Sequence, residues 1–191
     1  MIPIFTHGIP SNPIIIWDVG WVGSPTLEHR EALIPVTSFI STYENRIDKK
    51  GRVSVPSAYR LALGNEAYQG VIAYPSLTDT TIEVFGRSTL EQLNQRSFDE
   101  SLAQGNYAYT LLGSSEDGLI EAIMAIASEL PFDTEGRIIL PSHLADHALI
   151  TDRATFVGRG SKFQIWNPEE YEMHQAGELD ALRARMASSN Q

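Results

Sequence analysis

Residues 48–57 are Asp-Lys-Lys-Gly-Arg-Val-Ser-Val-Pro-Ser, and residues 133–142 repeat this pattern as Asp-Thr-Glu-Gly-Arg-Ile-Ile-Leu-Pro-Ser. In each copy an Asp opens a tight turn, and a Gly three residues later can adopt the positive φ that such turns require. An Arg follows at once, then an aliphatic run typical of a strand, then Pro and a Ser placed to cap a short helix. The two copies therefore predict two similar units of strand, turn, strand and short helix.

The repeat extends beyond the turns, because residues 82–90 align with residues 163–171 once gaps are allowed. Each of these segments is an alternating strand that runs into a helix start. The repeating unit is thus a small sheet with its helices. We expect a mixed β fold with short α-helices, in which the two repeats share one core.

The composition is that of a globular protein, with 191 residues of which 42% are hydrophobic. No run of 18 apolar residues occurs, so we expect no membrane partner. The chain has no cysteine, which excludes disulfides and thiolate zinc sites and is typical of a cytoplasmic protein.

The charge of the chain argues against a nucleic-acid partner, because 14 basic and 24 acidic residues give a net charge of -10. The distribution of this charge is uneven. Residues 46–60 hold five basic residues and one acidic residue, whereas residues 131–145 hold one basic and two acidic residues. Phosphate contact depends on charge within about 8 Å at physiological salt, so a local basic face on the first repeat can act on an acidic protein.

Five segments are expected along the chain: an N-terminal extension (1–35), a first repeat (36–87), a helical linker (88–124), a second repeat (125–172), and a C-terminal helix and tail (173–191). The extension contains five of the ten prolines. We expect it to be disordered, or to be upstream DNA read as protein with translation starting near Val36.

Three further helices are predicted from caps and apolar spacing. Ser88 or Thr89 caps a helix with Leu90 and Leu93 facing inward. Residues 115–117 cap a second helix, which carries Leu119, Ile120, Ile123 and Met124 at helical spacing. Asn167 caps a third helix that extends to about Arg185, with a weak point at Gly177 and a frayed end at residues 188–191.

The duplicated turns, their order and the segment Gly158-Arg159-Gly160-Ser161-Lys162-Phe163 resemble the MraZ family over roughly residues 38–171. The resemblance implies two tandem AbrB-like swapped-hairpin repeats, each a double-psi-like small barrel. It also implies a sequence-specific transcriptional regulator, nucleoid-associated, that assembles into rings. Such a regulator binds double-stranded DNA at promoter repeats and controls the division and cell-wall gene cluster, including its own gene.

Arg52 is the residue predicted to contact bases, because its planar guanidinium matches the O6 and N7 acceptors of guanine. The alternative is that Arg52 only pairs with Asp48 across the turn. Lys49, Lys50, Arg46 and Arg60 are predicted phosphate contacts, with a solvated surface as the alternative.

Arg137 occupies the matching position of the second repeat, but Asp133 and Glu135 beside it should repel phosphate. DNA contact and a structural or subunit-pairing role both remain open for it. Asp48, Gly51, Asp133 and Gly136 are assigned to forming the turns. The resemblance makes Arg159 and Lys162 candidate interface or DNA contacts, with a plain loop as the alternative.

No catalytic motif is present, so we expect no enzyme activity and no cofactor. His143 and His147 have a spacing that could bind zinc, but they lack a third ligand nearby, so no metal site is assigned. A second functional hypothesis is an AbrB-type dimerising interaction or antitoxin module without operator specificity, which would hold a toxin through the C-terminal tail.

Overall fold

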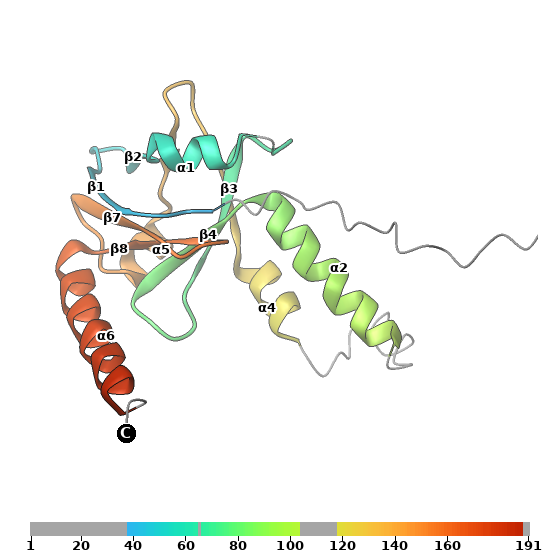
Figure 1. The fold of residues 1–191 in the computed structure, drawn as a ribbon. Helices are drawn as coiled ribbons and strands as arrows, with labels where there is room; N and C mark the ends of the chain where they lie inside the picture. Colours follow the sequence, from blue (N-terminus) through green and yellow to red (C-terminus); the bar gives the residue numbers. More distant parts are fainter. Residues whose placement is uncertain (1–37, 65, 104–117, 189–191) are drawn as a thin grey trace, which may run out of the picture. The chain divides into compact units, whose positions relative to one another are not determined.

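The computed structural model describes residues 38–64, 66–103 and 118–188 (Figure 1), and all of them belong to one unit, Val36–Gln191. The expectations for residues 1–35, for the cap at 115–117 and for the end of the chain past Ser188 lie outside the described residues.

The first repeat forms the elements that its sequence predicts. They are β1 (Thr42–Arg46), β2 (Arg52–Ser54), α1 (Ser57–Ala62), β3 (Gly70–Pro75) and β4 (Thr81–Phe85). The second repeat follows the same order with β5 (Ser128–Pro131), β6 (Arg137–Ile139), α5 (Ser142–His147), β7 (Arg153–Gly158) and β8 (Phe163–Trp166). Between the repeats lie α2 (Arg87–Ala103) and α4 (Leu119–Ile126), and α6 (Pro168–Ser188) ends the described chain.

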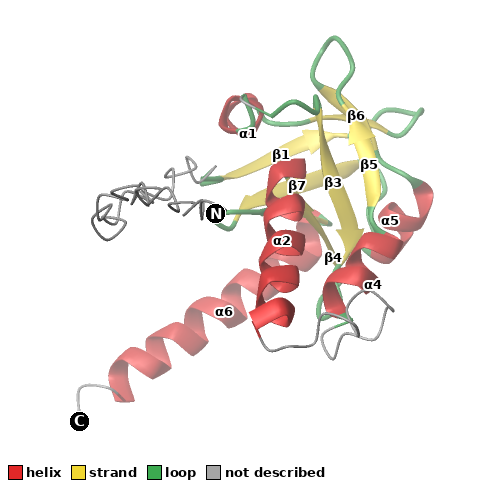
Figure 2. Cartoon of the chain, turned by 90° about the vertical axis from the view of Figure 1, so that its right-hand side faces the viewer, coloured by secondary structure: helices red, strands yellow, loops and turns green. Residues whose placement is uncertain are grey.

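The strands of the two repeats interleave in one antiparallel sheet of order β1-β7-β8-β4-β3-β5. Figure 2 shows strands of both repeats in this sheet, with α2 in front of it. Strands β1 to β4 of the first repeat correspond to β5 to β8 of the second. If each strand is replaced by its counterpart, the same order results, read from the other edge of the sheet. A pseudo-twofold axis therefore passes between β8 and β4. The same axis passes through a separate ribbon, in which β2 pairs with β6. This is the swapped-hairpin arrangement that the family resemblance implies, although the sheet is open and the described strands form no closed barrel.

One core serves both repeats, since the largest buried cluster takes side chains from each. Val53, Tyr59 and Val84 come from the first repeat, and Ile138 and Phe156 from the second. These side chains fill the space between the sheet, the β2-β6 ribbon and the short helices α1 and α5. Burial of this shared cluster is the main stabilising contribution to the fold.

The opposite face of the sheet is covered at its two ends by different helices (Figure 1). Near β3 and β4, α2 and α4 pack on a small cluster of Ile72, Phe85 and Ile123. Near β7 and β8, the first turns of α6 pack on Val157 and Trp166 through Tyr171. None of the described helices combines the length and apolar content that crossing a membrane requires.

Two predicted helix caps are wrong. Ser57 and Ser142 are the first residues of α1 and α5, and the cap positions belong to Pro56 and Pro141, with no side-chain cap hydrogen bond. The carbonyl of Pro56 accepts hydrogen bonds from the backbone N–H groups of Tyr59 and Arg60. Because proline is already extended at the end of the strand, the helix starts one residue earlier than the Ser pattern indicates.

The long helices also differ from the prediction. Leu93 on α2 remains 38% exposed instead of facing inward, and Ile123 is the buried residue of α4. Leu90 of α2 and Ile123 of α4 are the side chains that pack into the small cluster on the sheet. No break occurs at Gly177, because α6 is continuous from Pro168 to Ser188. Asn167 does cap this helix, since its Oδ1 accepts hydrogen bonds from the N–H groups of Glu169 and Glu170.

Candidate nucleic-acid interface

The first duplicated turn is closed by Asp48. Its Oδ1 accepts hydrogen bonds from the backbone N–H groups of Lys50 and Arg52, at 2.8 and 3.0 Å. Its Oδ2 accepts from Nε of Arg52 at 2.7 Å and pairs with Nη2 at 2.6 Å. Gly51 has a φ of +75°, which residues with a Cβ rarely adopt. The Asp-x-x-Gly-Arg pattern thus builds the turn and orients the arginine in a single arrangement.

The second turn has the same backbone and a different charge. Asp133 accepts from the N–H groups of Glu135 and Arg137 and from Nε of Arg137, and Gly136 has a φ of +73°. Here, however, a second carboxylate takes part, because Nη1 of Arg137 lies 2.8 Å from Oε2 of Glu135. The Arg137 guanidinium is therefore held between two acids, whereas that of Arg52 is held by one.

Each turn is joined to the opposite repeat by a backbone hydrogen bond. The Leu140 N–H donates to the carbonyl of Gly51, and the Val55 N–H donates to the carbonyl of Gly136. Sequence analysis missed these contacts, because the two partners lie in different repeats and a backbone donor has no sequence signature. They make the turns rigid extensions of the β2-β6 ribbon.

The two turns lie at opposite ends of this ribbon. Arg52 pairs with Ile139 at one end, and Ser54 pairs with Arg137 at the other. Val55, which hydrogen-bonds to Gly136, lies four positions beyond Gly51, so the turn glycines are about 14 Å apart at the usual rise of a strand. The structure therefore does not bring Arg52 and Arg137 together at one point.

The first turn carries the exposed cations. The side chains of Arg46, Lys49 and Lys50 are exposed, and none of them forms an ion pair with any residue that the structure describes. Arg52, with its side chain 33% exposed, lies in the same hairpin. Four of the five basic residues predicted to contact DNA from the first repeat thus share one end of the ribbon.

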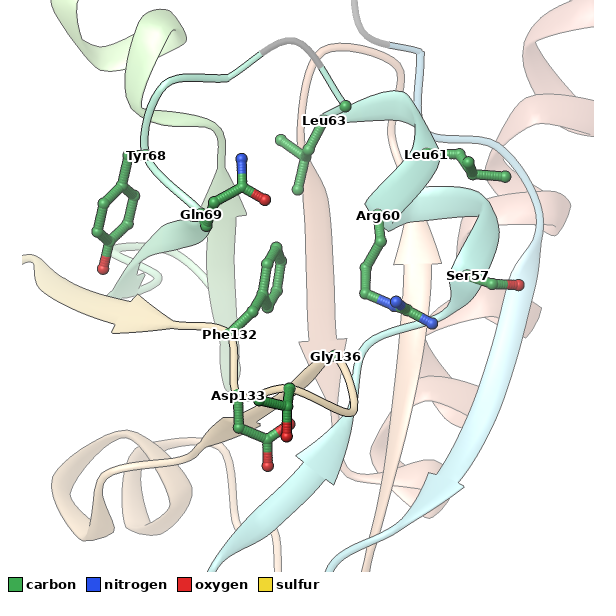
Figure 3. A pocket seen from close by; sticks show the side chains of 11 residues that line it. Ser57, Arg60, Leu61, Leu63, Tyr68, Gln69, Phe132, Asp133 and Gly136 are labelled. Atoms are coloured by element: carbon green, nitrogen blue, oxygen red, sulfur yellow. The ribbon is translucent and has the colours of Figure 1, made fainter.

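Arg60 is the exception, because α1 places it beside the second turn (Figure 3). Its Nε donates to the carbonyl of Val55 at 3.2 Å. Its guanidinium lies so close to Gly136 that a Cβ there would be 2.5 Å from Cζ of Arg60. Together with Phe132, the two residues line a pocket of about 440 Å³. Arg60 therefore lies with the second turn and not with the four cations of the first turn.

The turn carboxylates are strongly acidic. Hydrogen bonds from the Arg52 side chain and backbone lower the pKa of Asp48 from 3.8 to about 2. The backbone and side chain of Arg137 lower the pKa of Asp133, and the same contact raises the pKa of Arg137. Both turns therefore keep their ion pairs at neutral pH.

The other candidate residues have partners elsewhere in the fold. Arg159 pairs with Glu178 on α6 through Nη1 and Nη2, at 3.0 Å each, and Lys162 pairs with Glu83 at 2.9 Å. His143 lies 3.4 Å from the Ser128 hydroxyl, and His147 lies 3.2 Å from the Asp79 carbonyl. No group of three or more metal-ligating side chains occurs among the described residues.

The sequence of the chain is similar to those of several named proteins. A family model described as "MraZ protein, putative antitoxin-like" matches residues 123–188. Proteins named transcriptional regulator MraZ from Rickettsia peacockii and Rickettsia rickettsii are 44% and 45% identical over 136 residues, which is 71% of this chain and 85% of each relative. The corresponding protein of Rickettsia bellii is 45% identical over 134 residues, 70% of this chain and 83% of the relative. With identity at this level over most of both chains, the protein belongs to the MraZ family of transcriptional regulators.

Proposed function

We propose that this regulator binds double-stranded DNA in a sequence-specific manner through the first-repeat turn, residues 46–52. It acts as a cytoplasmic, nucleoid-associated ring homo-oligomer on tandem G-rich promoter repeats, and represses the division and cell-wall gene cluster that includes its own gene. The observation that carries this proposal is the concentration of Arg46, Lys49 and Lys50, without ion pairs among the described residues, at one rigid end of a chain of net charge -10.

The ion pair of Arg52 supports base recognition. Asp48 engages the side of the guanidinium formed by Nε and Nη2. The opposite edge of the Arg52 guanidinium, which carries one N–H of Nη1 and one N–H of Nη2, can donate to a second bidentate acceptor. Guanine presents such an acceptor pair, O6 and N7, in the major groove. The pairing with Asp48 and the base contact are therefore compatible, because the first orients the group that makes the second.

Arg137 has a structural role under this proposal. Its fork is engaged at Nε by Asp133 and at Nη1 by Glu135. With Arg60 beside this turn, the two arginines only balance the carboxylates of Asp133 and Glu135, so a phosphate meets no net attraction there. The second turn then stabilises the β2-β6 ribbon that presents the first turn. Arg60, which lies beside the second turn, shares this structural role.

Assembly compensates for the small size of one binding turn. Four basic side chains provide modest affinity, and salt screens much of it. Several copies held in one ring engage tandem repeats together, and the effective concentration of the second and later turns raises the overall affinity. The regular spacing of the copies in turn selects regularly spaced repeats.

The test is DNA binding to the segment upstream of the gene's own start codon, compared between the parent chain, Arg52→Ala and Arg137→Ala. Loss of one bidentate guanine contact should weaken binding to the G-rich repeat by about 1–3 kcal/mol, with little change on DNA that lacks the repeat. Arg137→Ala serves as the matched control, since it removes the equivalent arginine from the other turn. Equal binding by Arg52→Ala and the parent would refute the assignment of Arg52.

The description of the matching family model favours one alternative, an antitoxin-like interaction module that dimerises and holds a protein partner. In that case the C-terminal segment carries the function. Deletion of residues 173–191 would abolish partner binding, and the parent chain would show no preference for G-rich repeats over other DNA of equal length.

A further inference from the structure

The pocket beside the second turn combines an aromatic wall with a cation. It lies between α1, the segment that leads into β3 and the turn that follows β5. Its volume of about 440 Å³ is within the range of small-molecule sites, roughly 300–1,000 Å³. In Figure 3, Arg60 and the ring of Phe132 face the pocket from opposite sides, with Leu63 above them. The pocket therefore offers one charged contact and one apolar contact to the same ligand.

The two residues that give the pocket this character have no equivalent at the first turn. The offset of 85 positions between the turns (48 to 133) relates Arg60 to Ala145 and Phe132 to Ile47. Ala145 carries no charge and Ile47 carries no ring. The duplication thus supplies the backbone of both turns, whereas the cation and the aromatic wall occur only beside the second turn.

The guanidinium of Arg60 is held in place, yet it keeps donors for a ligand. Its Nε donates to the carbonyl of Val55 at 3.2 Å. One face lies against Gly136, because a Cβ there would be 2.5 Å from Cζ and Nη1 and 2.6 Å from Nε. Neither Nη1 nor Nη2 donates to any residue that the structure describes, and Arg60 forms no ion pair within that part of the chain. An edge with two such donors matches the two oxygens of a carboxylate.

The charges around the pocket select the kind of anion. Asp133 and Glu135 both pair with Arg137, and together with Arg60 these four groups have no net charge. A phosphate ester with two negative charges therefore gains no attraction from the surroundings, whereas a single carboxylate needs only its direct contact with Arg60.

The apolar wall selects the rest of the ligand. Leu63 is buried, and Phe132 is half-buried and packs against the main core, so both hold fixed positions. A flat ring can pack on them and remove apolar surface from water. The amide of Gln69 adds a polar group to the same wall.

We propose that this pocket binds a small aromatic carboxylate, whose carboxylate pairs with Nη1 and Nη2 of Arg60 and whose ring packs on Phe132 and Leu63. The proposal does not depend on DNA contact by the first turn, which lies at the other end of the β2-β6 ribbon. It gives the chain a ligand site that is joined to this ribbon through the hydrogen bond from Arg60 to Val55.

The test is a titration of the full chain with phenylacetate, followed by saturation-transfer NMR on the probe, which works whatever the mass of the protein. A probe with this few atoms should bind with a Kd of about 1–10 mM. Phenylacetamide has nearly the same shape and no charge, so it should bind about tenfold more weakly.

Three variants locate the site. Arg60→Gln should weaken phenylacetate binding about tenfold or more and leave phenylacetamide binding unchanged. Gln69→Glu adds a negative charge at an exposed position of the pocket wall and keeps the bond from Arg60 to Val55, so it should also weaken phenylacetate binding selectively. Arg96→Gln removes an exposed cation from α2, which does not line the pocket, and should bind both probes as the parent does. Circular dichroism verifies folding, and Gln69→Glu decides if Arg60→Gln does not fold.

Several results would overturn the assignment. These are equal affinity of the parent for both probes, no binding of phenylacetate well above the expected Kd, or unchanged phenylacetate binding in Gln69→Glu or in folded Arg60→Gln.

DNA binding separates this inference from the proposed function. A G-rich duplex should leave phenylacetate bound, because the first turn and the pocket lie at opposite ends of the ribbon. Competitive displacement by the duplex would place Arg60 on DNA and exclude a separate ligand site. If phenylacetate binds as described but the chain prefers no duplex, the DNA proposal fails and the ligand site stands.

Discussion

Removal of the two turn lysines tests whether the first turn contacts phosphate. Lys49 and Lys50 are exposed at the end of the β2-β6 ribbon and form no ion pair with any described residue. Replacing both by Ala leaves the turn intact, because the hydrogen bonds of Asp48 go to the backbone and to Arg52. The double variant therefore isolates charge from structure.

The expected magnitude follows from counterion release. If each lysine neutralises one phosphate, the slope of log K against log salt becomes less steep by about 1.8 for one bound turn. The ratio of variant to parent Kd should then grow about 12-fold as salt is lowered from about 200 to about 50 mM. If the parent and the double variant bind equally at about 1 M salt, the same difference in slope makes the Kd of the variant about 30-fold higher at about 150 mM salt.

Fluorescence anisotropy on a duplex with one G-rich repeat measures this change without avidity from the ring. Arg137→Ala is the control, since Asp133 and Glu135 already neutralise that guanidinium, and it should leave the slope unchanged. A double lysine variant with the parent's slope would show that the first turn does not lie on phosphate. A slope that changes equally for Arg137→Ala would place both turns on DNA.

Arg52→Lys should keep the salt dependence but lose about 1–3 kcal/mol of discrimination for G-rich repeats, as measured by competition, because Lys keeps the charge and lacks the planar fork. Gly136→Ala should lower the free energy of unfolding by about 1–3 kcal/mol in urea, because φ is +73° there. Adding Arg60→Ala should recover part of that loss, since the new Cβ meets the Arg60 guanidinium; full additivity would argue against this contact. Because the pKa of Asp48 is lower in the folded state, its ionised carboxylate stabilises the fold fully above pH 3.8, and this stabilisation is lost as the pH falls through about 2. The midpoint temperature of thermal unfolding should therefore fall as the pH is lowered between these two values, and it should fall less in Asp48→Asn.

Much of the local structure was predictable because it depends on nearby residues. The hydrogen bonds of Asp48 and Asp133 reach only two and four residues along the chain, and the positive φ of Gly51 and Gly136 is a local requirement. The strands were predictable from alternation, and the cap of α6 from Asn167. Local errors arose where a proline took the cap position predicted for a Ser, and at Leu93, which remains exposed while Leu90 packs against the sheet.

The composition of the candidate site was predictable only in part. Arg46, Lys49, Lys50 and Arg52 lie close together along the chain and remain together in the hairpin. Arg60 is near them in sequence, but the path of β2 into α1 moves it to the other turn. The five cations were predicted as one group because they are close in sequence. In the fold, the β2-β6 ribbon separates Arg60 from the other four.

The duplicated pattern by itself determined that two equivalent turns exist, that each aims an arginine with an aspartate, and that the first is the basic one. Those properties come from short-range hydrogen bonds and from side-chain charge, both encoded within ten residues. Tertiary structure decided which strands pair across the repeats, which turn Arg60 joins and which apolar faces remain open. These depend on backbone contacts and burial between residues far apart in the chain. One example is the hydrogen bond from the Leu140 N–H of the second repeat to the Gly51 carbonyl of the first, which no local signal encodes.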